Sequence, residues 1–136
     1  MSEMDKKAQE KLEQGYPKAE KVLNNNKKLD KVLTRTEKKL NLLPVVGTSL
    51  AMIPSMISLV RSYTKKEYTE IPIGTIIAIV SALIYFVSPV DLIPDVIPVA
   101  GHLDDAAVVG ACLALVKSDL DDYKEWRENK RHMLLK

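Results

Sequence analysis

The sequence predicts an all-α protein in which about three apolar helices lie between charged N- and C-terminal helices. Two stretches, residues 40–60 and 71–90, contain no charged side chain and are long enough to form helices. A third apolar stretch, residues 96–116, follows a corner rich in proline and aspartate. Charged side chains are concentrated in residues 1–39 and 117–136, so the mean hydropathy of −0.06 averages unlike parts of the chain.

The length of 136 residues is close to that of a single domain. We expect residues 1–40 to form a basic, partly amphipathic helical arm and residues 41–136 to form the apolar helical domain. Turn signals at residues 15–17 (Gly-Tyr-Pro) and 24–26 (Asn-Asn-Asn) should break the arm into separate helices. Its thin stripe of leucine and valine favours a helix pair that binds a partner or a membrane surface.

The apolar stretches have lengths that suit a lipid bilayer. About 20 helical residues match the roughly 30 Å hydrocarbon core, and residues 71–90 meet this length without a charge. Residues 40–60 fit less well because prolines and hydroxyl side chains dilute them. We therefore expect a protein of the cell membrane, with a helical hairpin at residues 71–116 and both basic ends on the cytoplasmic side. The alternative is a soluble cytoplasmic helical protein with unusually apolar central helices.

Small side chains recur at every fourth position in all three apolar stretches. This spacing places them on one helix face, where they let neighbouring helices approach closely. The predicted helix-packing residues are Gly47, Ala51, Ser55, Gly74, Ala78, Ala82, Ala106, Gly110 and Ala114.

The corner between the second and third apolar stretches is the most distinctive part of the sequence. Ser88 is a suitable helix N-cap, with Pro89 at the first helical position and Asp91 in the first turn. Pro98 stops a helix from continuing, and Gly101 permits a sharp reversal. The residues that define this corner are Ser88, Pro89, Asp91, Pro94, Asp95, Pro98, Gly101, His102, Asp104 and Asp105.

This corner resembles the signature of the YkvA-like family, a domain of unknown function in small membrane-associated bacterial proteins. The family pattern runs Ser-Pro-apolar-Asp-Leu-Ile-Pro-Asp, then an apolar-Pro step, then Gly, two variable residues and Asp-Asp. Every signature position is matched within residues 88–105, and the resemblance extends over roughly residues 55–127. It implies a helical membrane hairpin and supplies no established enzymatic activity.

The four aspartates of the corner allow three interpretations. In the first, they cap helices and fix the hairpin. In the second, Asp91, Asp95, Asp104 and Asp105, with His102 nearby, bind a divalent cation, since carboxylate oxygens suit Mg²⁺, Ca²⁺ or Mn²⁺. In the third, paired carboxylates perform acid–base catalysis, although the sequence has no nucleophile motif or phosphate-binding loop. We expect the first interpretation, no catalysis and no required cofactor, with the metal site left open.

The composition of the chain bears on which partners it can bind. The formal net charge of +2 and the aromatic content of 5% argue against nucleic-acid binding. The single cysteine, Cys112, lies in an apolar stretch and cannot form an internal disulfide, so we expect it in the core. Residues 117–134 should form an amphipathic helix with Leu120, Tyr123 and Trp126 along its apolar edge.

The sequence thus predicts a small membrane-associated protein that acts as an interaction or scaffold module. Membrane lipid is one expected partner, and residues 1–40 or 117–134 are expected to bind a protein partner; homo-oligomerisation is left open. The alternatives are a cation-handling membrane protein that uses the aspartate corner and a membrane-acting effector or immunity-type protein.

Overall fold

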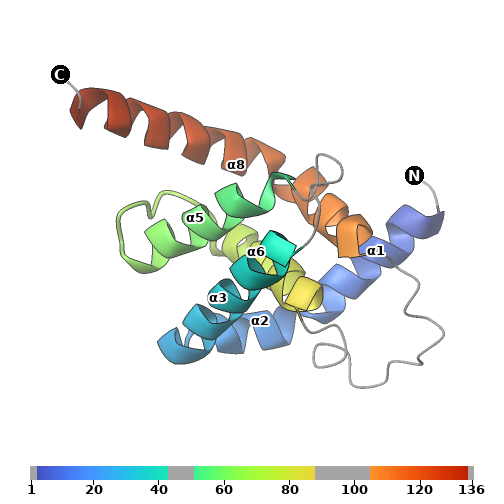
Figure 1. The fold of residues 1–136 in the computed structure, drawn as a ribbon. Helices are drawn as coiled ribbons and strands as arrows, with labels where there is room; N and C mark the ends of the chain where they lie inside the picture. The colour runs from blue at the N-terminus through green and yellow to red at the C-terminus, as the bar shows by residue number, and fades with distance from the viewer. Residues whose placement is uncertain (1–2, 43–50, 88–104, 135–136) are drawn as a thin grey trace.

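The computed structural model describes residues 3–42, 51–87 and 105–134. These ranges form six α-helices (Figure 1), which confirms the predicted all-α class. The helices are α1 (Glu3–Gln14), α2 (Tyr16–Leu23), α3 (Asn26–Leu42), α5 (Ile53–Thr64), α6 (Ile73–Val87) and α8 (Asp105–Leu134).

Both helix breaks predicted near the N-terminus are confirmed. Gly15 separates α1 from α2, and Pro17 lies in the first turn of α2, where a missing backbone N–H leaves no hydrogen bond unmade. Between α2 and α3, the side-chain oxygen of Asn25 accepts a hydrogen bond of 3.1 Å from the backbone N–H of Lys28. This contact satisfies one of the free N–H groups at the start of α3.

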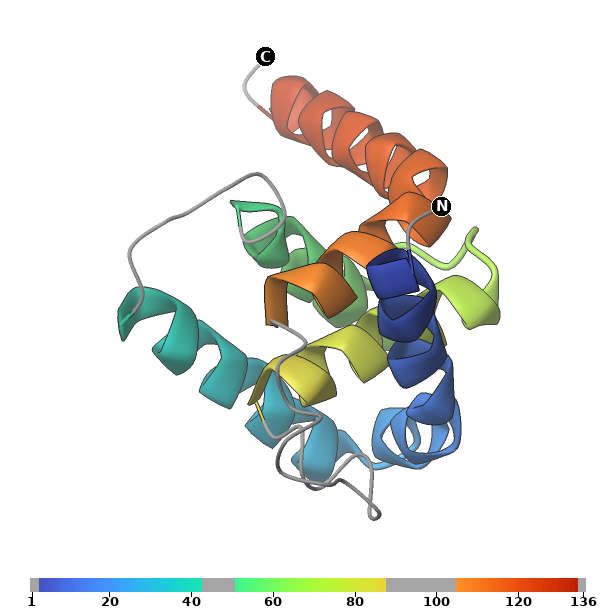
Figure 2. The same cartoon turned by 90° about the vertical axis from the view of Figure 1, so that its right-hand side faces the viewer.

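Helix α6 lies at the centre of the molecule. It packs against α1, α2, α3, α5 and α8, and Figure 2 shows the other helices around it. Ile76 and every residue from Ala78 to Phe86 are buried. A helix that is apolar on all sides needs an apolar environment on all sides, and here the neighbouring helices provide it.

Within the described ranges, none of the helices combines the length and the apolar character needed to cross a bilayer. Helix α6 has 15 residues.

The N-terminal helices share the core with α6 and α8. Ala8, Leu12, Leu29 and Leu33 are buried in the same apolar cluster as the residues of α5, α6 and α8. The hydroxyl of Ser81, on α6, donates a hydrogen bond of 2.7 Å to the backbone carbonyl of Leu12. The stripe of leucine and valine that suggested a binding arm therefore packs within this chain.

Helix α8 is a single helix of 30 residues, so the expected boundary at residue 117 falls inside it. Val109, Cys112, Val116, Leu120 and Tyr123 are buried at steps of three or four residues, which keeps one helix face against the bundle. The charged residues that begin at Lys117 therefore mark no boundary between helices, because the buried face of α8 continues past them.

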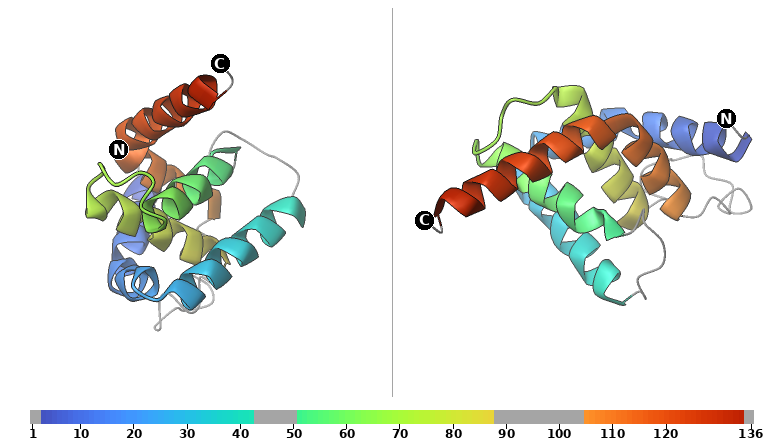
Figure 3. Two further views of the ribbon diagram at one scale, coloured as in Figure 1. Left: turned by 90° about the vertical axis from the view of Figure 1, so that its left-hand side faces the viewer. Right: turned by 90° about the horizontal axis from the view of Figure 1, so that it is seen from above.

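The C-terminal part of α8 runs past the rest of the bundle (Figures 1 and 3). We call residues 124–134 the α8 extension. All its side chains are exposed except Trp126, which is half-buried.

Candidate functional site

The predicted aspartate corner lies almost entirely outside the described residues. Its members from Ser88 to Asp104 belong to the range 88–104, and Asp105 is the first residue of α8. The capping and cation-binding roles of Asp91, Asp95, Asp104 and Asp105 therefore stay predictions. Across residues 3–42, 51–87 and 105–134, no three His, Cys, Asp or Glu side chains gather closely enough to hold a metal ion.

The small residues predicted to pack helices occupy varied environments. Ala78 and Ala82 are buried in α6, Ser55 and Gly110 are half-buried, and Ala51 and Ala114 are exposed. Gly74 is also exposed, and a Cβ added there would meet nothing within 4 Å. Gly47 lies outside the described residues, and Ala106 falls in the first turn of α8.

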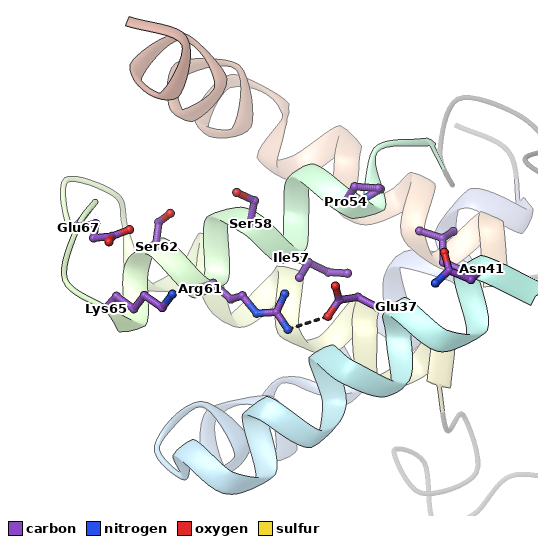
Figure 4. A pocket seen from close by; sticks show the side chains of 10 residues that line it. Glu37, Asn41, Pro54, Ile57, Ser58, Arg61, Ser62, Lys65 and Glu67 are labelled. Carbon is purple, nitrogen blue, oxygen red and sulfur yellow. Dashed lines mark hydrogen bonds and ion pairs between the residues drawn. The ribbon is translucent and has the colours of Figure 1, made fainter. Parts of the chain in front are cut away.

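A groove between α3 and α5 is a candidate site whose lining residues were not among those predicted from the sequence. It has a volume of about 390 Å³ and is partly open to solvent. Leu40, Pro54 and Ile57 supply apolar surface, and polar side chains line the groove from both α3 and α5 (Figure 4). The lining residues are Glu37, Leu40, Asn41, Pro54, Ile57, Ser58, Arg61, Ser62, Lys65 and Glu67.

An ion pair crosses this groove. Arg61 of α5 donates a hydrogen bond of 2.7 Å from Nη2 to Oε1 of Glu37 on α3. The hydrogen bond to Glu37 raises the pKa of Arg61 above its usual value. Because the two side chains are 35% and 46% exposed, we expect the pair to contribute no more than about 1 kcal/mol to stability.

Three hydroxyl groups form a cluster in the wall of the groove. The phenol oxygen of Tyr123 lies 2.6 Å from the hydroxyl of Ser58 and 2.9 Å from that of Ser62. Ser58 and Ser62 line the groove, whereas Tyr123 reaches them from α8 and is almost completely buried. The two serine hydroxyls thus bond to a tyrosine that links α5 to α8, an arrangement suited to holding helices together.

A cluster of aromatic rings continues from Tyr123 toward the surface. The ring of Tyr68, in the connection between α5 and α6, lies 5.2 Å from that of Tyr123 and 4.9 Å from that of Trp126. The pKa of the Tyr68 phenol is raised above its usual value, mainly because the side chain is partly removed from water. Such contacts between rings contribute about 0.5–1.5 kcal/mol beyond their burial, and here they hold α8 where it leaves the bundle.

Cys112, predicted to be a core residue, is buried in α8. Burial raises the pKa of its thiol to about 12, so the thiol stays protonated near neutral pH. Only the thiolate is a good nucleophile, which makes a reactive role for Cys112 unfavourable. His132 is exposed near the end of α8.

The sequence contained a signal for the groove. Four polar side chains lie on one face of α5 because they are spaced by three, one and three residues. They are Ser58, Arg61, Ser62 and Lys65. The opposite wall could not be predicted because Glu37, Leu40 and Asn41 come from α3, and only the packing of α3 and α5 on α6 brings them near.

Comparison with known proteins places the chain in a family. The family model described as "Protein of unknown function (DUF1232)" matches residues 75–111, which run from the first turn of α6 into α8. The "Uncharacterized membrane protein YkvA" of Bacillus subtilis (strain 168) is 36% identical over 75 residues, which cover 55% of this chain and 71% of the relative. No solved structure matches the chain significantly. The chain therefore belongs to the YkvA-like family of proteins, whose function is not established.

Proposed function

We propose that this protein is a membrane-associated interaction module that uses the α8 extension as a binding surface. The observation that carries the proposal is that α8 continues past the bundle, with ten of the eleven side chains in residues 124–134 exposed. The core of the bundle needs α8 only as far as the ring cluster at Tyr123 and Trp126.

Exposed apolar side chains at the end of the extension support a binding role. Met133 is 75% exposed and Leu134 is 78% exposed. A solvent-exposed helix end with large apolar side chains gains free energy when a partner covers them, at about 25 cal/mol per Å² of apolar surface. The name of the Bacillus subtilis relative, an uncharacterised membrane protein, supports a membrane as the place of action.

The surroundings of Ser58, Ser62 and Cys112 do not favour a role for them as nucleophiles. The hydroxyls of Ser58 and Ser62 bond to Tyr123, and the thiol of Cys112 is buried and protonated. A nucleophile in catalysis needs an adjacent base or a lowered pKa.

Membrane association is tested by fractionating cells that express the full chain with a small tag at the N-terminus. We expect the protein in the membrane pellet and its release by alkaline carbonate, because the proposed contact is a surface contact. A protein that stays in the supernatant before any wash would refute the membrane part of the proposal. Retention after carbonate would favour insertion into the bilayer instead.

Partner binding is tested by photo-crosslinking in the same cells. A crosslinking residue replaces Glu128 in the extension, and a matched variant carries it in place of Glu10, an exposed glutamate of α1. We expect a discrete adduct of higher mass from position 128 and none from position 10. The same adducts at both positions, or none at position 128, would count against the α8 extension as the binding surface.

A further inference from the structure

The α8 extension separates its charges onto two sides of the helix. It carries four basic and two acidic side chains. Arg127, Lys130, Arg131 and Leu134 follow at steps of three, one and three residues, so they lie on one side. Glu125, Glu128, Asn129 and His132 fall together on the opposite side.

Apolar side chains border the basic side. Met133 lies seven residues after Trp126, so the two share one line along the helix next to Lys130. The Lys130 ammonium lies 5.1 Å from the centre of the Trp126 ring, a distance at which a cation and a ring attract each other. The basic side therefore combines cations with an aromatic ring and two exposed apolar chains, Met133 and Leu134.

The bundle holds the extension in a defined direction. The Trp126 ring stacks on that of Tyr123 at 5.8 Å and lies 4.9 Å from that of Tyr68. One turn before Tyr123, Thr75 of α6 donates a hydrogen bond of 2.6 Å to the carboxylate of Asp119 on α8. The basic side thus continues from an anchored helix and needs little ordering to meet a partner.

We infer that the α8 extension binds an anionic lipid surface through Arg127, Lys130 and Arg131, with Met133 and Leu134 entering the headgroup region. This inference rests on the membrane association proposed above and names the lipid charge that the protein recognises. Cations on one helix side attract anionic headgroups, and flanking apolar side chains add burial at the same surface.

Charge repulsion argues against a second copy of this chain as the partner that binds the basic side of the α8 extension. Two extensions that met through this side would bring Arg127, Lys130 and Arg131 close to the same residues of the partner, and like charges repel. An acidic protein could pair with the cations, but its charge alone would not account for the exposed apolar side chains of Met133 and Leu134. An acidic protein partner is therefore an outcome that the experiment must detect.

The test uses the purified full chain and vesicles of phosphatidylcholine alone or with 30% phosphatidylglycerol. The variant replaces Arg127, Lys130 and Arg131 with glutamine. A matched control replaces three exposed lysines of α3, Lys27, Lys28 and Lys31, with glutamine, which removes the same charge elsewhere. Far-UV circular dichroism and thermal melts verify that both variants fold.

We expect the original chain and the α3 variant to sediment with the anionic vesicles and to stay in solution with phosphatidylcholine alone. Each cation near an anionic surface is worth roughly fivefold in affinity, so the α8 variant should bind about 100-fold more weakly. Trp126, the single tryptophan, should shift its emission to shorter wavelength on binding. High salt should reverse both signals.

Three outcomes would overturn the inference. Equal loss in both triple variants would show a general charge effect without a site. No vesicle binding by a chain that still fractionates with cell membranes would reject lipid binding by α8 while leaving the proposed function intact; a salt-sensitive crosslink to an acidic protein would then identify the occupant. Absence from both vesicles and cell membranes would reject the proposed function as well.

Discussion

Substitution of Leu12 tests whether the N-terminal helices belong to the same folded unit as the rest of the chain. Leu12 lies on α1 with 0% of its surface exposed, in the same apolar cluster as residues of α6 and α8. The change Leu12→Ala removes the buried side chain but keeps the backbone carbonyl that accepts the hydrogen bond from Ser81. It therefore isolates the packing contribution.

The expected loss is large compared with the stability of the molecule. Replacing a fully buried leucine with alanine costs about 2–5 kcal/mol, through lost burial and the cavity that remains. Domains of this size are stable by about 5–15 kcal/mol, and each kcal/mol lowers the melting temperature by roughly 3–5 °C. We therefore expect Leu12→Ala to lower the melting temperature by at least about 6 °C.

Urea unfolding measures the loss of free energy and thermal unfolding measures the melting temperature, each followed by far-UV circular dichroism and by fluorescence of Trp126. Because Trp126 lies on α8, its signal reports on a helix other than the one that is changed. The matched control is Leu115→Ala, since Leu115 is 51% exposed on α8 and should lose no more than about 0.5 kcal/mol. If Leu12→Ala behaves like the control, or if the two signals separate, α1 does not share one cooperative core with α8.

Four further predictions follow from the structure. Tyr123→Phe removes the hydroxyl shared by Ser58 and Ser62, so the free energy of unfolding should fall by about 1–3 kcal/mol in urea titrations; no change would show that water replaces the bond. Cys112 should react with a thiol reagent at pH 8 far more slowly in the folded than in the unfolded chain, because burial shields the thiol from the reagent and raises its pKa from 9.0 to about 12. Since the folded pKa is the higher one, the contribution of Cys112 to stability is complete below pH 9 and is lost as the pH rises toward 12, which unfolding titrations at pH 8 and pH 10 would detect. Gly74→Ala should raise the free energy of unfolding by about 0.4–1 kcal/mol, because the added Cβ meets nothing within 4 Å; a loss would instead support the packing role that its spacing suggested.

Several features were predictable because they depend on neighbours in the sequence. The breaks at Gly15 and at residues 24–25 follow from glycine, proline and asparagine residues that favour turns over helix, and both occur where expected. The apolar edge of Leu120 and Tyr123 follows from a spacing of three residues, and both side chains are buried. The resemblance to the YkvA-like family is likewise confirmed by the comparisons.

The candidate site was less predictable because it joins distant parts of the chain. The groove depends on Glu37 and Arg61 meeting across α3 and α5, and its hydroxyl cluster depends on Tyr123 reaching α5 from α8. No local pattern encodes these distances. The aspartate corner, by contrast, is evident in the sequence, but it falls in residues 88–104, outside the described ranges.

The sequence by itself determined the helical class, the helix breaks and which stretch is most apolar. Only the tertiary structure decided what covers that stretch. A helix that is apolar on every side has the same sequence pattern whether lipid or protein surrounds it. In the described part of the chain, α1, α2, α3, α5 and α8 surround α6, because each supplies one apolar stripe and α6 has no polar side to leave uncovered.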